Sequence, residues 1–195
     1  MTVRPSTAAL VLALAASGAH AADAPTWDVD HEASRVGFVA EQSGSPVPGE
    51  FTAFDAEIAF AREALDTSRV EVEIEVASVE AGSAERNDTI TSQQLFHAEK
   101  YPTARFVAGD FTHKQDNRYV AHGELTMRGE THPVDLPFTL EVARTNGTLK
   151  ATASGEVTVK RLRWGIGQGV WRNTGMVPNA VDIEIEIVAT RPAGG

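Results

Sequence analysis

The chain of 195 residues carries 27 acidic and 17 basic side chains, a net charge of −10, and has no cysteine. A surface this acidic repels nucleic acid and anionic lipid headgroups, which excludes a nucleic-acid-binding protein. The absence of cysteine excludes a disulfide framework, thiolate catalysis, cysteine-ligated zinc and covalently attached haem. The fold must therefore be stabilised by its apolar core.

Residues 1–21 have the three-part layout of a secretory signal peptide. Arg4 is followed by an apolar run from Ala8 to Ala16 and then by Ala19-His20-Ala21. The run is shorter than the roughly 20 apolar residues that a membrane-spanning helix needs. We predict cleavage after Ala21, which removes one of the 17 basic residues and none of the 27 acids and leaves a net charge of −11. Residues 22–195 then form a single exported domain that is not an integral membrane protein.

Apolar and charged residues alternate along most of this domain. In residues 70–76, valine and isoleucine occupy every second position and Glu71, Glu73 and Glu75 lie between them, as in a half-buried antiparallel strand. The alternation recurs in residues 54–60 and 181–187, more weakly in 36–40, 119–127, 134–142 and 151–159, and briefly in 104–111. Turn signals follow at residues 116–117, 128–129 and 146–147, and the Gly- and Pro-rich residues 44–49 predict a hairpin loop. The pattern predicts an all-β fold with eight antiparallel strands, in a barrel or a sandwich.

One segment breaks the alternation. Residues 83–101 place Ile90, Leu95 and Phe96 among polar residues, with no Gly or Pro. We predict one helical segment near residues 83–100, which ends before Pro102 because proline disfavours a helix at the preceding residue.

The interior of such a barrel has two possible states. Ala121 and Gly123 share a predicted inward face with Leu125 and Met127, and small residues also occupy the inward positions of 151–155. A barrel of eight strands either fills its interior with side chains or holds one small ligand. The small residues favour a hollow interior, whereas the many phenylalanine and tryptophan side chains could fill it, and the pattern leaves both alternatives open. In a hollow barrel the apolar walls would select a ligand made mostly of hydrocarbon.

Motifs for catalysis and metal binding do not occur. The five histidines after the signal peptide lack the spacing of metal ligands, and no G-x-S-x-G string is present. Gly165, Gly167 and Gly169 lack the strand and helix that a phosphate-binding loop requires, so we interpret them as a tight connection at the barrel rim. We predict no catalytic residue, no metal and no cofactor other than a bound lipid.

Several strings in a fixed order resemble a known family. They are residues 27–31 (WDVDH), 34–38 (SRVGF), 99–106 (EKYPTARF), 123–129 (GELTMRG) and 161–171 (RLRWGIGQGVW). Over residues 27–190 the chain resembles the YceI-like family of periplasmic lipid-binding proteins. It departs from the family at Asn87, which follows Arg86 where the family usually has aspartate.

The resemblance implies a lipocalin-like antiparallel barrel in the periplasm, closed by a helix, with no catalytic residues. Its interior would bind an isoprenoid lipid, either a polyprenyl quinone or a polyprenyl phosphate. Family members are often encoded beside or fused to inner-membrane b-type cytochromes, which implies such a cytochrome as a partner; a homodimer is a further possibility. The predicted apolar lining consists of Phe38, Phe54, Ile58, Val72, Ile74, Phe106, Ala121, Gly123, Leu125, Met127, Phe138 and Trp164. We expect Gly123→Phe to block this space.

Two other functions stay open on the sequence. A stress-response interaction module would have a packed barrel and an acidic outer face, including Glu71 to Glu75, that docks a basic partner. An enzyme is the third alternative, and it would depend on a histidine such as His31 or His122.

Overall fold

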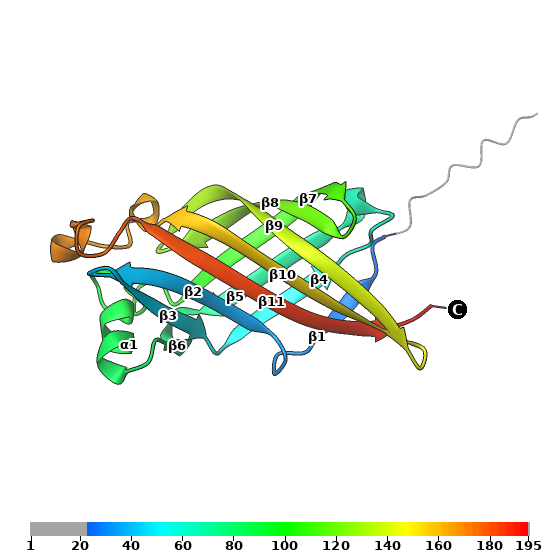
Figure 1. Ribbon diagram of the computed structural model, residues 1–195, viewed down its shortest axis with the longest axis horizontal. Helices are drawn as coiled ribbons and strands as arrows, with labels where there is room; N and C mark the ends of the chain where they lie inside the picture. Colours follow the sequence, from blue (N-terminus) through cyan, green and yellow to red (C-terminus); the bar gives the residue numbers. More distant parts are fainter. Residues whose placement is uncertain (1–22, 195) are drawn as a thin grey trace, which may run out of the picture.

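Eight antiparallel strands close a barrel in the computed structural model, which describes residues 23–194 (Figure 1). In order around the barrel they are β1 (Thr26–Val29), β4 (Phe54–Ala59), β5 (Arg69–Glu75), β7 (Thr103–Gln115), β8 (Arg118–Met127), β9 (Glu130–Thr145), β10 (Thr148–Lys160) and β11 (Ala180–Pro192). The short strand β1 pairs with both β4 and β11 and so completes the ring. The predicted eight-stranded antiparallel barrel is confirmed.

Three more strands extend the wall beside β11. The N-terminal half of β11 pairs with β2 (Arg35–Gln42), which pairs with β3 (Ser45–Phe51) and through it with β6 (Val79–Glu80). The hairpin loop predicted at residues 44–49 is wrong, because the turn is only Ser43-Gly44 and β3 follows at once. Pro46 and Pro48 tolerate a strand here because β6 pairs only with the last two residues of β3, so the prolines lie on a free edge.

The predicted turns between the long strands are confirmed. Arg128-Gly129 and Asn146-Gly147 join β8 to β9 and β9 to β10, with positive φ at both residues of each turn. Two-residue turns of this kind match the right-handed twist of the strands they connect. They therefore set the register of the two hairpins.

The helix α1 (Ala84–Thr91) covers only the first half of the predicted helical segment. Ser83 caps its N-terminus by accepting a hydrogen bond from the Arg86 N–H, and residues 92–101 form turns in which His97 has a positive φ. Asn87 accepts from the Ala81 N–H at 2.8 Å and donates to Glu80 at 3.0 Å, a donation that an ionised aspartate at this position could not make. No helix within residues 23–194 is long and apolar enough to cross a bilayer. The predicted signal peptide lies outside the described residues.

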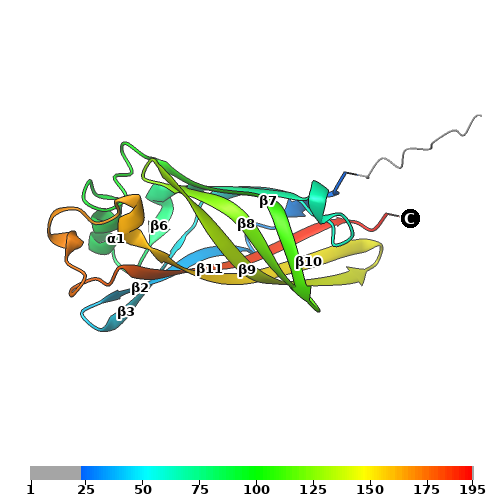
Figure 2. The ribbon, with the colours of Figure 1, turned by 90° about the horizontal axis from the view of Figure 1, so that it is seen from above.

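Residues 161–179, which we call the rim segment, connect β10 to β11 at the same end of the barrel as α1 (Figure 2). The segment contains two 3-10 turns, η3 (Arg161–Trp164) and η4 (Gly169–Arg172). Gly165, Gly167 and Gly169 all have positive φ, so the predicted tight connection at the rim is confirmed. A Cβ atom on Gly167 would lie 1.8 Å from the Arg161 guanidinium, which shows how closely the segment wraps that side chain.

The Arg161 side chain holds the rim segment together. It is 4% exposed, and its guanidinium donates hydrogen bonds of 2.7–3.0 Å to the carbonyl oxygens of Ile166, Trp171, Val177 and Pro178. Burial lowers the pKa of this guanidinium, and in the described part of the chain no carboxylate lies at ion-pair distance from it. Four backbone acceptors therefore take the place of a counter-ion.

We predict that Arg161→Met lowers the free energy of unfolding by at least about 2 kcal/mol, because it leaves the rim carbonyl groups without donors. Hydrogen exchange at residues 165–179 should become faster than in the wild type. Arg163→Met is the control, since Arg163 is an exposed side chain of the same segment, and it should change the stability by less than about 0.5 kcal/mol. Equal denaturation midpoints for the two variants would refute the role of Arg161.

Candidate functional site

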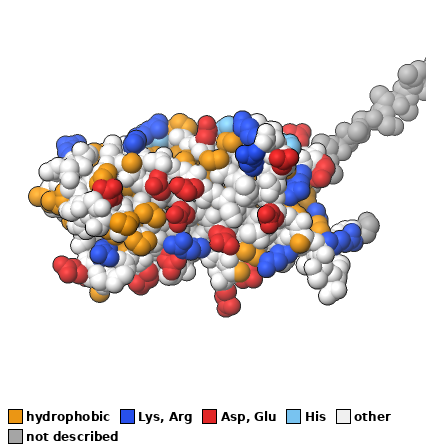
Figure 3. Space-filling view, in the orientation of Figure 1, with side chains coloured by type: hydrophobic (Ala, Val, Ile, Leu, Met, Phe, Trp, Pro, Cys, Tyr) orange, Lys and Arg blue, Asp and Glu red, His pale blue; other side chains and the backbone are white. Residues whose placement is uncertain are grey.

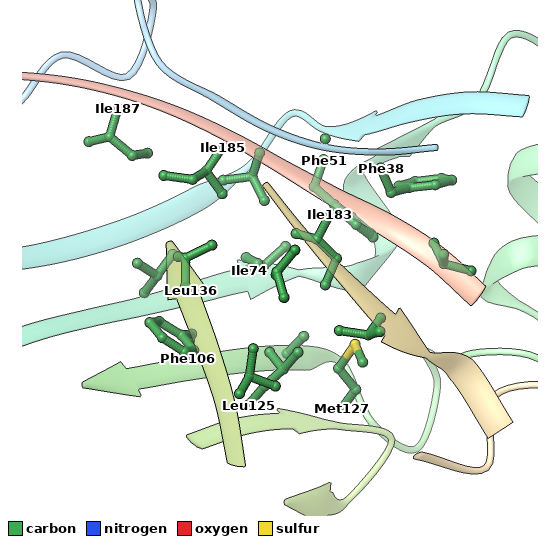
Figure 4. Close-up of a pocket in the computed structure, with 18 of the residues that line it drawn as sticks. Phe38, Phe51, Ile74, Phe106, Leu125, Met127, Leu136, Ile183, Ile185 and Ile187 are labelled. Carbon is green, nitrogen blue, oxygen red and sulfur yellow. The ribbon is translucent and has the colours of Figure 1, made fainter. Parts of the chain in front are cut away.

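The inward faces of the strands enclose an elongated cavity of about 310 Å³, at the lower end of the range for small-molecule sites (Figure 4). Phe106, Leu125 and Met127 contribute to one wall, and Ile183 and Ile185 of β11 to the wall that faces it. Lining residues come from α1 and from many of the strands, among them β2, β4, β5, β7, β8, β9, β10 and β11. The cavity therefore follows the barrel axis.

The barrel is hollow, not packed solid. Val72, Phe106, Val157 and Ile183 all line the cavity, yet each keeps part of its surface accessible. Buried apolar residues form three clusters around this space, and members of each, such as Leu125, Phe111 and Ile90, also line the cavity. The alternative left open by the sequence is thus decided in favour of a cavity.

An aromatic cluster closes the end of the barrel away from α1. Phe60 packs edge-on against Phe111, Tyr119 and Phe138, with ring centroids 5.3–6.1 Å apart. Phe60, Phe111 and Leu140 are buried and line the cavity at this end. Aromatic and aliphatic side chains therefore close the cavity at this end.

The polar side chains of the lining lie at the end that carries α1 and the rim segment. They are Glu41, Gln42, Arg86, Thr89 and Arg161. Glu41 and Gln42 end strand β2, Arg86 and Thr89 lie on α1, and Arg161 begins the rim segment. The site is thus an apolar tube whose few polar lining residues lie at one end, which we call the mouth, a shape that suits a molecule with a long hydrocarbon tail and a single polar head.

Most of the predicted lining residues meet at this cavity. Nine of them line it: Phe38, Ile58, Val72, Ile74, Phe106, Ala121, Leu125, Met127 and Phe138. The structure places Phe54, Gly123 and Trp164 elsewhere. Phe54 begins β4 with its ring 5.2 Å from that of His31. Trp164 is 1% exposed in the buried cluster that also contains Met127 and Ile166, and its Nε1 donates to the Leu125 carbonyl oxygen at 2.9 Å.

Gly123 is covered by an aromatic ring and does not open onto the cavity. A Cβ atom there would lie 2.5 Å from the Phe106 ring and 2.7 Å from the Val107 carbonyl oxygen. Phe38 covers Gly49 in the same way, with ring atoms 2.3–3.0 Å from the position of the missing Cβ. Both rings lie against the wall because glycine leaves room for them. Gly123→Phe would therefore collide with the wall, and the expectation that it fills the hollow is wrong.

The prediction missed much of the lining near the mouth. Seven unpredicted residues line the cavity here: Phe51, Ile90, Leu95, Phe96, Ile166, Trp171 and Val177. Leu95, Phe96, Ile166 and Val177 come from turns and loops, where no periodicity marks an inward position. By contrast, Ile183, Ile185 and Ile187 follow the period-two pattern of β11, which would have been sufficient to find them.

A row of hydrogen-bonded side chains on the outer face resembles a catalytic relay. Nδ1 of His122 lies 2.7 Å from Asp135, and its Nε2 lies 2.9 Å from the Thr112 hydroxyl. The three residues lie on the adjacent strands β7, β8 and β9, whose N–H groups are largely used in the sheet and offer no paired donors for an oxyanion. Asp135 is largely exposed, so the row fits a cross-strand ladder on a solvated surface.

The other polar clusters of the described residues are likewise explained as surface interactions. Residues 23–194 contain no group of three or more His, Asp or Glu side chains that could hold a metal ion. On the outer face, Glu71 forms ion pairs with Arg105 and Arg69. The hydrogen bond from Arg105 is the main cause that lowers the pKa of this carboxyl group, and the bond from Arg69 adds to it. The acidic stripe on β5 is therefore partly neutralised by its neighbours.

Comparisons with known proteins agree with this architecture. Residues 27–189 match the YceI-like domain. A UPF0312 protein of Photorhabdus laumondii is 35% identical over 56% of this chain and 57% of its own length, and one of Pseudomonas putida is 30% identical over 76% and 72%.

Solved structures show the same barrel. The crystal structure of Burkholderia cenocepacia BcnA has a TM-score of 0.77 and 32% identity, over 83% of this chain and 99% of that one. A polyisoprenoid binding domain from Saccharophagus degradans, implicated in plant cell wall breakdown, has a TM-score of 0.66 and 15% identity, over 87% of this chain and 100% of its own. By sequence and by fold, the chain belongs to the YceI-like family.

Proposed function

We propose that this protein binds an isoprenoid lipid inside its barrel and carries it through the periplasm. The observation that carries the proposal is the apolar cavity that is closed at one end and lined by polar side chains only at the other. A polyprenyl chain matches this geometry because it is long, branched and entirely hydrocarbon, with one polar group at its end.

The hydrophobic effect supplies the affinity in this proposal. Each buried methylene contributes roughly 0.8 kcal/mol, so a tail that fills the cavity binds without any specific polar contact. The headgroup then lies at the mouth, within reach of Gln42, Arg86 and Thr89. Either a quinone ring or a phosphate can accept hydrogen bonds there, so the candidate ligands are polyprenyl quinones and polyprenyl phosphates.

The comparisons support lipid binding in general. One structural neighbour is described as a polyisoprenoid binding domain, and this likeness within the YceI-like fold supports the proposal of a binding protein. Export by the signal peptide is part of the proposal, as is an inner-membrane b-type cytochrome as a partner in quinone exchange. A homodimer also stays a prediction.

The interaction module with a packed barrel is less well supported. Its premise was a solid interior, whereas the barrel contains a cavity. The carboxylate of Glu71, in the middle of the proposed docking face, already pairs with Arg69 and Arg105.

We predict that purified protein releases an isoprenoid lipid on denaturation and organic extraction, detected by mass spectrometry. The reason is that a tail buried in the cavity should stay bound through purification. Protein that is recovered empty, and that takes up neither a polyprenyl quinone nor a polyprenyl phosphate when these are added, would contradict the proposal.

A pair of substitutions on β10 tests where the lipid lies. Ala153 lines the cavity and Ser154, the next residue, faces solvent. Ala153→Phe puts an aromatic ring into a space of about 310 Å³ and should lower lipid affinity at least about tenfold, equivalent to about 1.4 kcal/mol. Ser154→Phe adds the same ring outside and should leave uptake unchanged. Titration with a fluorescent polyprenyl analogue measures both, and circular dichroism checks that both fold. Equal uptake by the two variants would place the ligand outside the barrel.

A further inference from the structure

The charge of the rim segment is opposite to that of the rest of the protein. The rim segment, residues 161–179, has three basic residues and no acidic one, and Lys160 directly precedes it at the end of β10, in a chain of net charge −10. Arg161 is buried, whereas Lys160, Arg163 and Arg172 are exposed. Acidic residues at this end of the barrel belong to other elements, among them Glu41 on β2 and Glu85 and Asp88 on α1. The rim segment is thus a local cationic surface beside the mouth of the cavity.

The same segment exposes apolar side chains. Val170 is 67% exposed and Met176 is 41% exposed, and the third large apolar residue exposed in the described chain, Val142, lies near the other end of the barrel. Hydrophobic side chains reach the surface at the end that carries the rim segment (Figure 3). Exposed apolar residues among cations are typical of proteins that insert shallowly into an anionic bilayer.

The tip of the β2–β3 hairpin, residues 42–48, continues this surface. It carries no charge, and its Ser43 N–H donates to the Met176 carbonyl oxygen at 2.9 Å. Val47 of the hairpin tip and Trp171 and Val177 of the rim segment line the cavity itself. The rim segment therefore contributes apolar side chains both to the outer surface and to the cavity, and the hairpin tip contributes Val47 to the cavity.

We propose that the rim segment and the hairpin tip dock on the surface of an anionic phospholipid bilayer and place the mouth of the cavity against it. The cations meet the lipid phosphates while Val170 and Met176 enter the interface, and the acidic remainder of the protein is repelled and stays in solution. The purpose of docking rests on the proposed function, because an isoprenoid tail could then pass between bilayer and barrel without crossing water. The docking itself requires no bound isoprenoid.

Co-sedimentation with vesicles tests the proposal on the full-length mature protein. The wild type should bind vesicles of phosphatidylethanolamine and phosphatidylglycerol, bind phosphatidylcholine vesicles more weakly, and dissociate as salt is raised. Val170→Glu and Arg172→Glu should each lower the partition coefficient at least about tenfold. Val142→Glu is the matched control, because it makes the same change at an exposed valine far from the mouth, and it should leave binding unchanged.

Two results would overturn the proposal: a wild type that does not sediment with anionic vesicles, or a loss of binding in Val142→Glu as large as in Val170→Glu. Lipid uptake from detergent, measured on the same samples, separates this inference from the proposed function. Uptake without vesicle binding refutes docking alone, whereas vesicle binding without uptake supports docking and refutes the isoprenoid carrier.

Discussion

Closure of the hydrogen-bonded ring allows the interior of this protein to stay open. Each of the eight barrel strands has a neighbour on both sides, so the wall is held by backbone pairing and does not need a packed centre. The closing element is β1, only four residues long, which joins β4 to β11. Buried clusters then stabilise the fold, and an apolar cavity remains between the strands.

The two ends of the cavity differ in the side chains that line them. Along the strands, alternation places the charged side chains outside, so the tube is apolar over its length. Polar lining appears where β2, α1 and the rim segment meet, and the opposite end is closed by aromatic rings. In the proposed function, a molecule with one head and one tail would therefore have one favourable orientation, with its head at the end that carries the polar side chains.

The charge and the hydropathy of the outer surface also change along the barrel axis. The body of the barrel is acidic and avoids anionic surfaces, whereas the rim segment is cationic and exposes apolar side chains. The buried side chain of Arg161 contributes to both the surface and the cavity. Its guanidinium holds the rim segment in shape by donating hydrogen bonds to four carbonyl oxygens, and the side chain also lines the mouth of the cavity.

The sequence by itself determined the class of fold, most of the inward positions and the turns, because period-two alternation and residues such as Asn146-Gly147 act over a few neighbours. It missed β1, β3 and β6, because β1 and β6 are too short to show a period and β3 carries Pro46 and Pro48. Only the tertiary structure decided that the barrel is hollow, that Phe106 covers Gly123, and that Leu95, Phe96 and the rim segment form the mouth. These features depend on contacts between residues far apart in the chain, and no local pattern encodes how much space such contacts leave.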